Sequence, residues 1–339
     1  MPDNSSGHTL TLGANAMPGT NWPIPFDWAF LMHKFSGVIP PVVSPMKSAD
    51  QLDVEAVDRV VEHLIQGGVA GLFVLGTTGE GPSLTYQMRY EMVERTCETV
   101  NGRVPVLVGV TDTSLAESIA LAEHAASCGA AAIVAAAPFY FDVSQAALEA
   151  WFRELADRSP VPVMLYNMPS CVGVTLDLAI VDALSHHSNV AGIKDSGGDW
   201  TYFQALCDKH HNREDFVIFM GPEELLAEAV AAGANGGVCG GANLLPQVYS
   251  RLYLAAVRKN AVEIAHWKQT IADMFASVYR DDDQRMKLIP GLKLAMEECG
   301  LCNATVAPPL MTVTESHAQR IRSSIPRLLA ACEFSTVEA

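Results

Sequence analysis

Residues 131–169 read AAIVAAAPFYFDVSQAALEAWFRELADRSPVPVMLYNMP, and they contain one complete strand–helix–strand unit. The runs at 131–136 and 163–166 are apolar throughout, which predicts strands that are buried on both faces. Between them, at 145–157, apolar residues recur at helical spacing. A helix between two such strands predicts a parallel pair joined by a right-handed crossover.

This unit repeats along the chain, so that eight short apolar runs alternate with eight helical stretches. The predicted strands lie at 38–43, 71–75, 106–110, 131–136, 163–166, 190–193, 216–220 and 236–239. The predicted helices lie at 54–66, 86–100, 115–128, 145–157, 176–184, 202–210, 224–232 and 246–259. Eight such units predict an α/β protein with a (β/α)8 TIM barrel. An open doubly wound sheet would more often carry a G-x-G-x-x-G turn after its first strand, and residues 38–45 have none.

Helical periodicity continues after the eighth unit, at 264–277, 291–299 and 315–332. We therefore expect a barrel catalytic domain at 37–259 and a C-terminal helical subdomain at 260–339. Residues 1–36 form an N-terminal leader, and its aromatic residues leave two interpretations open, a loose tail and an arm that packs on a neighbour.

Composition and charge exclude several classes of protein. The chain has 22 basic and 38 acidic residues, a net charge of −16, and no basic run of five or more residues. This balance repels phosphate backbones, so we expect no nucleic-acid partner. The longest apolar stretch, 129–141, is shorter than the roughly 20 residues of a membrane-spanning helix, so we expect no membrane partner. The N-terminus lacks the features of a secretory signal, which predicts a cytoplasmic protein with a small-molecule partner.

The eight cysteines are spread along the chain, and Cys299 and Cys302 form a lone C-x-x-C. No second pair and no nearby histidine completes a zinc site. We expect no metal there and interpret these cysteines as packed thiols.

In a barrel of this type the active site lies at the carboxyl ends of the strands. The second predicted strand is followed by GTTGE, residues 76–80, whose glycines allow a tight turn that exposes amide groups beside two hydroxyls. Such a turn suits a carboxylate or a phosphate. A plain strand-to-helix turn with a threonine cap is the alternative.

Two tyrosines follow neighbouring strands, Tyr140 after the fourth and Tyr166 after the fifth. If both approach Thr77, the three hydroxyls form a relay that moves protons. Amphipathic packing at the barrel rim explains a tyrosine at a strand end equally well.

Lys194 follows the sixth strand in GIKDSGGD, residues 192–199, and it is the only lysine predicted at the end of an internal strand. Its stem would lie in the apolar barrel and its amine at the mouth, where desolvation favours the neutral, nucleophilic form. A Schiff-base nucleophile requires this placement. The alternative is an ion pair with Asp195 or Glu80.

The seventh and eighth strands end in short polar or glycine-rich stretches. Glu223 and Glu224 come at the start of a helix, where carboxylates commonly complement the helix dipole. Gly240 and Gly241 leave room for a ligand, although tight packing explains glycines equally well.

Five motifs together resemble the dihydrodipicolinate synthase/N-acetylneuraminate lyase family: GTTGE (76–80), PFY (138–140), YNMP (166–169), GIKDSGGD (192–199) and GANGGV (233–238). The resemblance runs from about residue 37 to residue 310 in the family's order. It implies a class I lyase or aldolase in which Lys194 forms an imine with pyruvate or a related 2-oxo acid, to make or break a C–C bond or to dehydrate a sugar acid. No metal and no organic cofactor is implied.

The resemblance also implies roles for individual residues. Tyr166 matches the phenol that shuttles protons, and Tyr140 matches the phenol that family members lend across a dimer interface, which implies a homo-oligomer, a dimer or a tetramer. The carboxylate cradle and the pyruvate pocket match Thr77, Thr78, Gly79 and the backbone carbonyl of Val238.

Four positions bear on the choice of substrate. Synthases of the family carry an arginine for the aldehyde's carboxylate where this chain has Cys171, and a thiol cannot replace a bidentate guanidinium. Glu223, with Glu224, resembles the acidic pair with which sialic acid lyases hold sugar hydroxyls, and Ser196 keeps a hydroxyl beside the lysine.

Other activities stay open. The main alternative is a 4-hydroxy-tetrahydrodipicolinate synthase that condenses pyruvate with aspartate semialdehyde. A further alternative is a non-catalytic 2-oxo acid sensor, which would not need both a nucleophile and a proton relay.

Overall fold

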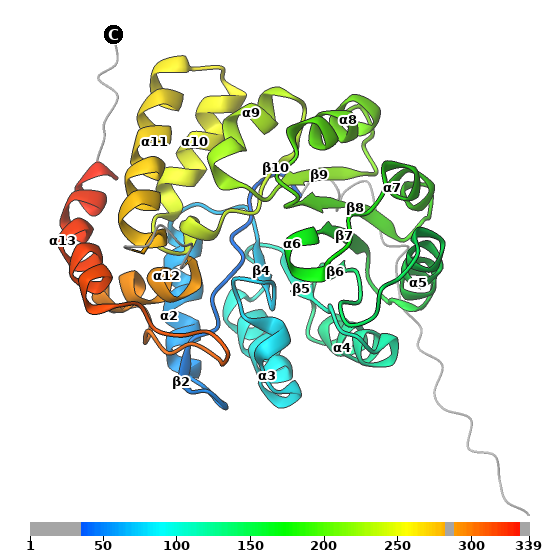
Figure 1. Ribbon diagram of the computed structural model, residues 1–339, viewed down its shortest axis with the longest axis horizontal. Coiled ribbons are helices and arrows are strands. Elements are labelled where there is room, and N and C mark those ends of the chain that lie inside the picture. The colour runs from blue at the N-terminus through cyan, green and yellow to red at the C-terminus, as the bar shows by residue number, and fades with distance from the viewer. Residues whose placement is uncertain (1–34, 282–287, 333–339) are drawn as a thin grey trace, which may run out of the picture.

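The computed structural model describes residues 35–281 and 288–332, and a curled sheet of parallel strands forms its centre (Figure 1). The strands follow the order β1-β10-β9-β8-β7-β6-β5-β4, so the strands from β4 to β10 pair in chain order and β1 pairs with β10. Their bounds are β1 Gly37–Val38, β4 Leu72–Val74, β5 Val106–Gly109, β6 Ala132–Ala136, β7 Val163–Asn167, β8 Val190–Asp195, β9 Val217–Met220 and β10 Gly236–Gly237.

Residues that follow β1 close the sheet into a barrel. Pro41 forms a parallel bridge with Phe73 of β4. The Val42 amide donates to the Phe73 carbonyl over 2.8 Å, and the Phe73 amide donates to the Pro40 carbonyl over 2.9 Å. Because Pro40 and Pro41 have no N–H group, the strand predicted at 38–43 is shorter in the structure. It consists of the two residues of β1, followed by the contacts with Phe73 described above. The predicted (β/α)8 barrel with C-terminal helices is confirmed.

Helices cover the outside of the sheet, and polar caps fix where several of them begin. The side chains of Asp53, Thr85, Ser114, Ser144 and Asp199 each accept a hydrogen bond from an amide of the first turn. The helices are α2 Val54–Gln66, α3 Tyr86–Val100, α4 Leu115–Ser127, α5 Gln145–Arg158, α7 Leu178–Ser185, α8 Trp200–His210, α9 Leu226–Ala231 and α10 Pro246–Val257.

Some local elements differ from the sequence expectation. The short helix α6, Pro169–Val172, and the antiparallel pair of β2, Met46–Ser48, and β3, Gln51–Leu52, were not predicted. Four residues are too few to show helical periodicity, although Pro169 at the first position is a start signal. The helix predicted at 224–232 is divided into a 3-10 turn, Glu223–Leu225, and α9.

Two layers of apolar side chains hold the barrel. The inner layer fills the barrel and includes Phe73, Met164, Tyr166 and Phe219. The outer layer lies between the strands and the surrounding helices. A Cβ on Gly236 would lie 1.9 Å from the Gly37 carbonyl oxygen, so only glycine lets β1 and β10 approach this closely.

The C-terminal helices pack on one side of the barrel, as Figure 1 shows. They are α11 Ala261–Met274, a π-helical turn Phe275–Tyr279, α12 Leu288–Glu298 and α13 Glu315–Ala331. Because α11 lies against α10, the expected boundary at 259/260 runs between two packed helices, and the domain division stays a prediction. The leader prediction falls mostly on residues 1–34, which lie outside the described residues. No helix in the described part is long and apolar enough to cross a membrane.

Candidate active site

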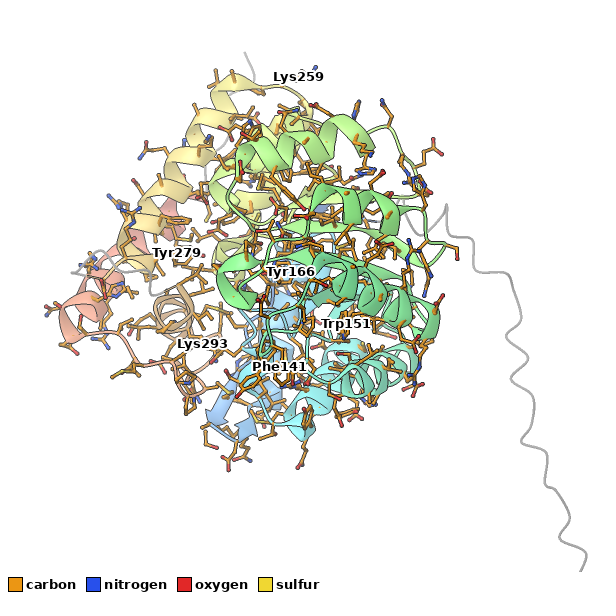
Figure 2. All side chains as sticks on the ribbon, turned by 45° about the vertical axis from the view of Figure 1, so that its right-hand side comes forward. Phe141, Trp151, Tyr166, Lys259, Tyr279 and Lys293 are labelled. Atoms are coloured by element: carbon orange, nitrogen blue, oxygen red, sulfur yellow. The ribbon has the colours of Figure 1, made fainter. Side chains whose placement is uncertain are left out.

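Pairing of β7 with β8 places Tyr166 beside Lys194. The Lys194 side chain lies inside the barrel with 4% of its surface exposed. Its Nζ atom is 4.0 Å from the centroid of the Tyr166 ring and 5.1 Å from that of Phe73. Two aromatic faces therefore hold the amine at the centre of the barrel mouth, where Figure 2 labels Tyr166.

The carboxylates that were candidate partners of Lys194 are occupied by other groups. Asp195 accepts hydrogen bonds from Asn167 Nδ2 at 2.7 Å and from the Gly197 amide at 3.1 Å. Burial raises the pKa of Asp195. Glu80 pairs with Lys293, 2.5 Å from its Nζ atom. Across residues 35–281 and 288–332, no ion pair or hydrogen bond involves the Lys194 amine, so the ion-pair alternative is wrong.

The predicted contact between Thr77 and Tyr166 is present. Thr77 Oγ1 lies 3.3 Å from Tyr166 Oη, although Thr77 follows β4 and Tyr166 lies in β7, with β5 and β6 between these two strands. The turn that carries Thr77 packs tightly, because a Cβ on Gly79 would lie 2.7 Å from the Val42 carbonyl oxygen. Ser44 Oγ donates to the Gly79 carbonyl over 2.6 Å, and Thr78 is buried. Two of the three predicted relay hydroxyls therefore meet.

A cavity of about 460 Å³ is lined by Thr77 and Tyr166, whereas Lys194 is not among the residues of its wall. The ends of β4 to β7, helix α6 and two C-terminal segments form its wall. Its polar lining includes Thr77, Thr111 and Tyr166, and the ion-paired Glu80 is the only charged residue among the described residues that line it. The remaining wall is largely apolar, with Phe73, Phe139, Met168, Val172, Ile289, Pro309 and Leu310.

A model of the dihydrodipicolinate synthetase family matches residues 34–328. This match spans the barrel and most of the C-terminal helices. The chain belongs to this family.

Similar members of the dihydrodipicolinate synthetase family carry different names. The chain is 32% identical to the probable 2-dehydro-3-deoxy-D-pentonate aldolase YjhH of Escherichia coli, over 86% of this chain and 96% of that protein. Dihydrodipicolinate synthase from Bacteroides thetaiotaomicron is 40% identical in structural alignment, with a TM-score of 0.83, over 86% of this chain and 98% of that chain. YagE of E. coli, solved in complex with pyruvate, is 30% identical, with a TM-score of 0.81. That alignment covers 87% of this chain and 99% of the YagE chain.

These likenesses confirm the predicted family and the predicted class, a lyase. Some of these relatives are named as synthases and others as aldolases. Their names therefore do not identify which of the substrates expected from the sequence this chain uses. The side chains of the site are the remaining source of that information.

Cys171 lies on α6 and is exposed at the edge of the cavity. The dihydrodipicolinate synthetase resemblance implies an arginine at this position in true synthases. Among the described residues that line the cavity, no arginine or lysine is present. The part of the cavity wall that the structure describes therefore offers no cation to a second carboxylate at this edge.

The structure does not bring Tyr140 to the other two hydroxyls. Its side chain is 78% exposed, and its ring contacts that of Phe141 at 5.1 Å between centroids. Phe139 and Phe141 beside it are also exposed. Within one protomer, Thr77 and Tyr166 are the two predicted relay residues in contact, and both the relay and the role of Tyr140 across an interface stay predictions.

Glu223 points away from the cavity into the contact between the barrel and the C-terminal helices. Its Oε2 accepts from the Gly241 amide and its Oε1 from Tyr249 Oη, both at 2.8 Å. Complete burial raises the pKa of Glu223 to about 7, against the lowering effect of these hydrogen bonds. The carboxylate is thus a buried structural group in this structure, and its predicted contact with substrate is not formed by the cavity wall.

Two other predicted residues lie close to the barrel backbone. The hydroxyl of Ser196 packs on Gly221, where a Cβ would lie 2.0 Å from Ser196 Oγ. Val238 is buried, and its amide donates to the Met220 carbonyl over 2.8 Å. Neither side chain lines the cavity.

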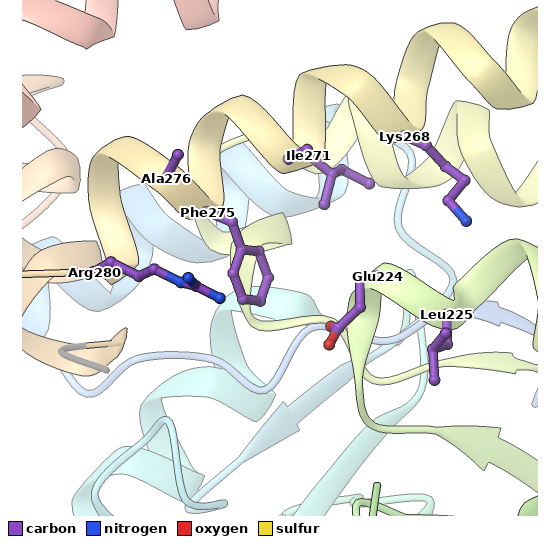
Figure 3. A pocket seen from close by; sticks show the side chains of 8 residues that line it. Glu224, Leu225, Lys268, Ile271, Phe275, Ala276 and Arg280 are labelled. Atoms are coloured by element: carbon purple, nitrogen blue, oxygen red, sulfur yellow. The ribbon is translucent and has the colours of Figure 1, made fainter. Parts of the chain in front are cut away.

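A larger hollow of about 620 Å³ lies between α11 and the turn after β9. Figure 3 shows Glu224, Phe275 and Arg280 facing it. Because Tyr166 and Thr77, which line the cavity of 460 Å³, are absent from its wall, its size does not mark the site of chemistry. No group of three or more His, Cys, Asp or Glu residues in the described ranges is arranged to hold a metal ion.

Sequence reasoning missed Lys293, the buried partner of Glu80. The signal was present in LIPGLKLAMEE, residues 288–298, where one lysine interrupts an apolar helix face. A lysine on such a face needs a buried partner, but the sequence does not say which carboxylate supplies it.

Proposed function

We propose that this protein is a class I lyase that acts on pyruvate or a related 2-oxo acid through an imine on Lys194. The supporting observation is a buried amine with no ion-pair partner in the described structure, held beside a tyrosine in the barrel mouth of a family of lyases. An amine without a carboxylate partner is free to attack a carbonyl carbon.

The reaction begins when the Lys194 amine adds to the keto carbon of the 2-oxo acid. Loss of water then gives a protonated imine at C2. When a base takes the proton of the hydroxyl on C4, the C3–C4 bond breaks and an aldehyde leaves, and the electron pair of that bond moves toward the imine to give an enamine. In the reverse direction, the resulting enamine attacks an aldehyde. Dehydration of a 2-oxo-3-deoxy sugar acid would use the same imine.

We assign to Tyr166 and Thr77 the movement of the protons that these steps require. Tyr166 Oη reaches Thr77 Oγ1, so a proton can pass between the reacting oxygen and the loop after β4. We assign the substrate carboxylate to the turn formed by Thr77, Thr78 and Gly79, which fixes the keto carbon near Lys194. Ser196, Val238 and Cys171 are proposed as the remaining contacts around the substrate.

The second substrate is proposed to lack a carboxylate at the Cys171 edge. Among residues 35–281 and 288–332, the wall beside Cys171 is neutral and largely apolar, and a buried carboxylate without a cation is unfavourable. Condensation with aspartate semialdehyde, the activity of a 4-hydroxy-tetrahydrodipicolinate synthase, is the second candidate because a synthase is among the similar structures. A non-catalytic 2-oxo acid sensor is the weaker alternative, because binding alone does not require both Lys194 and Tyr166.

We also propose a cytoplasmic homo-oligomer, a dimer or a tetramer. Exposed aromatic side chains at 139–141 support an interface at the barrel mouth, where Tyr140 would complete the relay of a partner. Sedimentation of the purified chain tests this proposal, and a monomer at micromolar concentration contradicts it.

The imine is tested by incubation with pyruvate, reduction with borohydride, and peptide mapping of the added mass. We expect the mass on Lys194 and none on Lys209, an exposed lysine paired with Asp182. A Lys194→Met variant serves as the matched control and should remain unlabelled. If neither pyruvate nor a panel of other 2-oxo acids labels Lys194, the proposed lyase mechanism is wrong and the sensor becomes the better interpretation.

A further inference from the structure

A buried ion pair joins the proposed carboxylate turn to the C-terminal helices. Lys293 of α12 has no exposed surface, and Glu80, the last residue of the GTTGE motif, is 3% exposed. The Lys293 Nζ atom lies 2.5 Å from Glu80 Oε1 and donates to the Thr305 carbonyl over 2.7 Å. The other oxygen, Glu80 Oε2, accepts from the Ala307 amide over 2.6 Å. Figure 2 labels Lys293 on α12 and Tyr166 in the barrel.

Stability alone is a poor reason for this pair. Removing two charges from water is unfavourable, and apolar side chains of similar size commonly give equal or greater stability at a buried site. Burial indeed lowers the pKa of Lys293, while Glu80 opposes that effect. The arrangement must therefore be explained by what the two charges hold in place.

The pair holds the backbone of the turn that carries Thr77. Glu80 adopts a left-handed conformation, with φ of 56° and ψ of 21°, which is unfavourable for a residue with a side chain. Its amide donates to the Thr77 carbonyl over 3.0 Å, and the Gly81 amide donates to the Gly76 carbonyl over 3.2 Å. Anchoring the Glu80 side chain on Lys293 and Ala307 thus fixes the turn through its own hydrogen bonds.

We propose that Glu80 and Lys293 are positioning residues that hold the Thr77–Thr78 turn in the geometry that receives the carboxylate of the 2-oxo acid. The inference rests on the proposed function. It makes α12 and the segment at 305–307 part of the catalytic unit. The pairing also removes an uncompensated negative charge from the cavity wall, where it would repel an anionic substrate.

The test compares two substrates that share a keto group and differ in charge. Pyruvate carries the carboxylate, and methyl pyruvate carries an uncharged ester. Trapping on Lys194 with borohydride is measured against the concentration of each, for the wild type and for Lys293→Met, Glu80→Gln and the double variant. Arg322→Met is the matched control, because Arg322 forms ion pairs with Glu298 and Glu315 away from the turn.

We expect Lys293→Met to raise the half-saturating pyruvate concentration on the order of tenfold, with methyl pyruvate changed by less than about twofold. The double variant should recover part of the loss, because it leaves no unpaired buried carboxylate. Glu80→Gln should show the same selectivity for pyruvate with a smaller change, and Arg322→Met should match the wild type.

Equal losses for both substrates would overturn the proposal, since a general structural role would not distinguish them. Unchanged pyruvate dependence in folded variants would also overturn it. If Lys293→Met does not fold, Glu80→Gln and the double variant decide the question by the same comparison. Failure of the wild type itself to trap any 2-oxo acid would overturn the proposed function, and this inference with it.

Discussion

The Lys194 amine lies 4.0 Å above the ring of Tyr166, its neighbour across the β7–β8 pair. The same phenol ends 3.3 Å from Thr77, so one tyrosine touches both the proposed nucleophile and the proposed carboxylate turn. This position gives Tyr166 two separable effects, one from its ring and one from its hydroxyl.

Replacing Tyr166 by phenylalanine keeps the ring over Lys194 and removes the hydroxyl. We expect kcat to fall by roughly 100-fold or more with little change in KM, because proton transfer is lost while binding remains. Borohydride should still trap the imine on Lys194, more slowly. Tyr202→Phe is the control, because that phenol donates to the Leu176 carbonyl and does not line the cavity. An unchanged kcat in Tyr166→Phe would exclude Tyr166 as the proton shuttle.

Replacing Cys171 by arginine should supply the cation that the cavity edge lacks. We expect the rate of condensation with aspartate semialdehyde to rise by about tenfold or more, since a charge-assisted hydrogen bond is strong at such a site. Cys171→Ser controls for loss of the thiol. Efficient condensation by the wild type, unchanged by the arginine, would favour the synthase activity and show that another group binds the aldehyde's carboxylate.

Tyr140 can be tested by mixing two inactive proteins. If it acts across an interface, Tyr140→Phe and Lys194→Met should each lose most activity alone. Mixed dimers should regain part of it, because one site then contains both native residues. Activity is measured after dissociation and reassociation of an equimolar mixture. Additive, near-zero activity of a mixture that has formed hybrid dimers would show that Tyr140 does not serve a partner's site.

Glu223 should make stability depend on pH. Its pKa is raised from 4.5 to about 7 by burial, so between these pH values the folded state binds more protons than the unfolded state. The contribution of Glu223 to the free energy of unfolding is therefore greatest below about pH 4.5. It falls as the pH rises to 7, by about 3 kcal/mol in total.

The Glu223→Gln variant mimics the protonated carboxyl and keeps partners for Gly241 and Tyr249. Urea unfolding of both proteins at pH 5 and pH 8 isolates the effect of this one group. We expect the wild type to lose stability relative to Glu223→Gln between the two pH values. A constant difference would show that Glu223 titrates near its ordinary pKa.

Much of the fold was predictable because strand and helix periodicity are local properties. The repeat of apolar runs and helical stretches predicted each barrel strand, and Lys194 was recognisable because a strand end in a parallel barrel is a defined place. The ends of strands and helices were less predictable where the spacing of apolar residues gives no pattern. This was so at the four-residue helix α6 and at Pro40 and Pro41.

Only the tertiary structure decided which of the candidate groups meet. Glu80 pairs with Lys293 rather than Lys194, and Glu223 accepts a hydrogen bond from Tyr249 of α10. Tyr140 stays on the surface. The sequence by itself determined the barrel and the residue types at its mouth, since these follow from local pattern. It could not determine their partners, because a carboxylate chooses among distant cations and amides by the packing that brings them together.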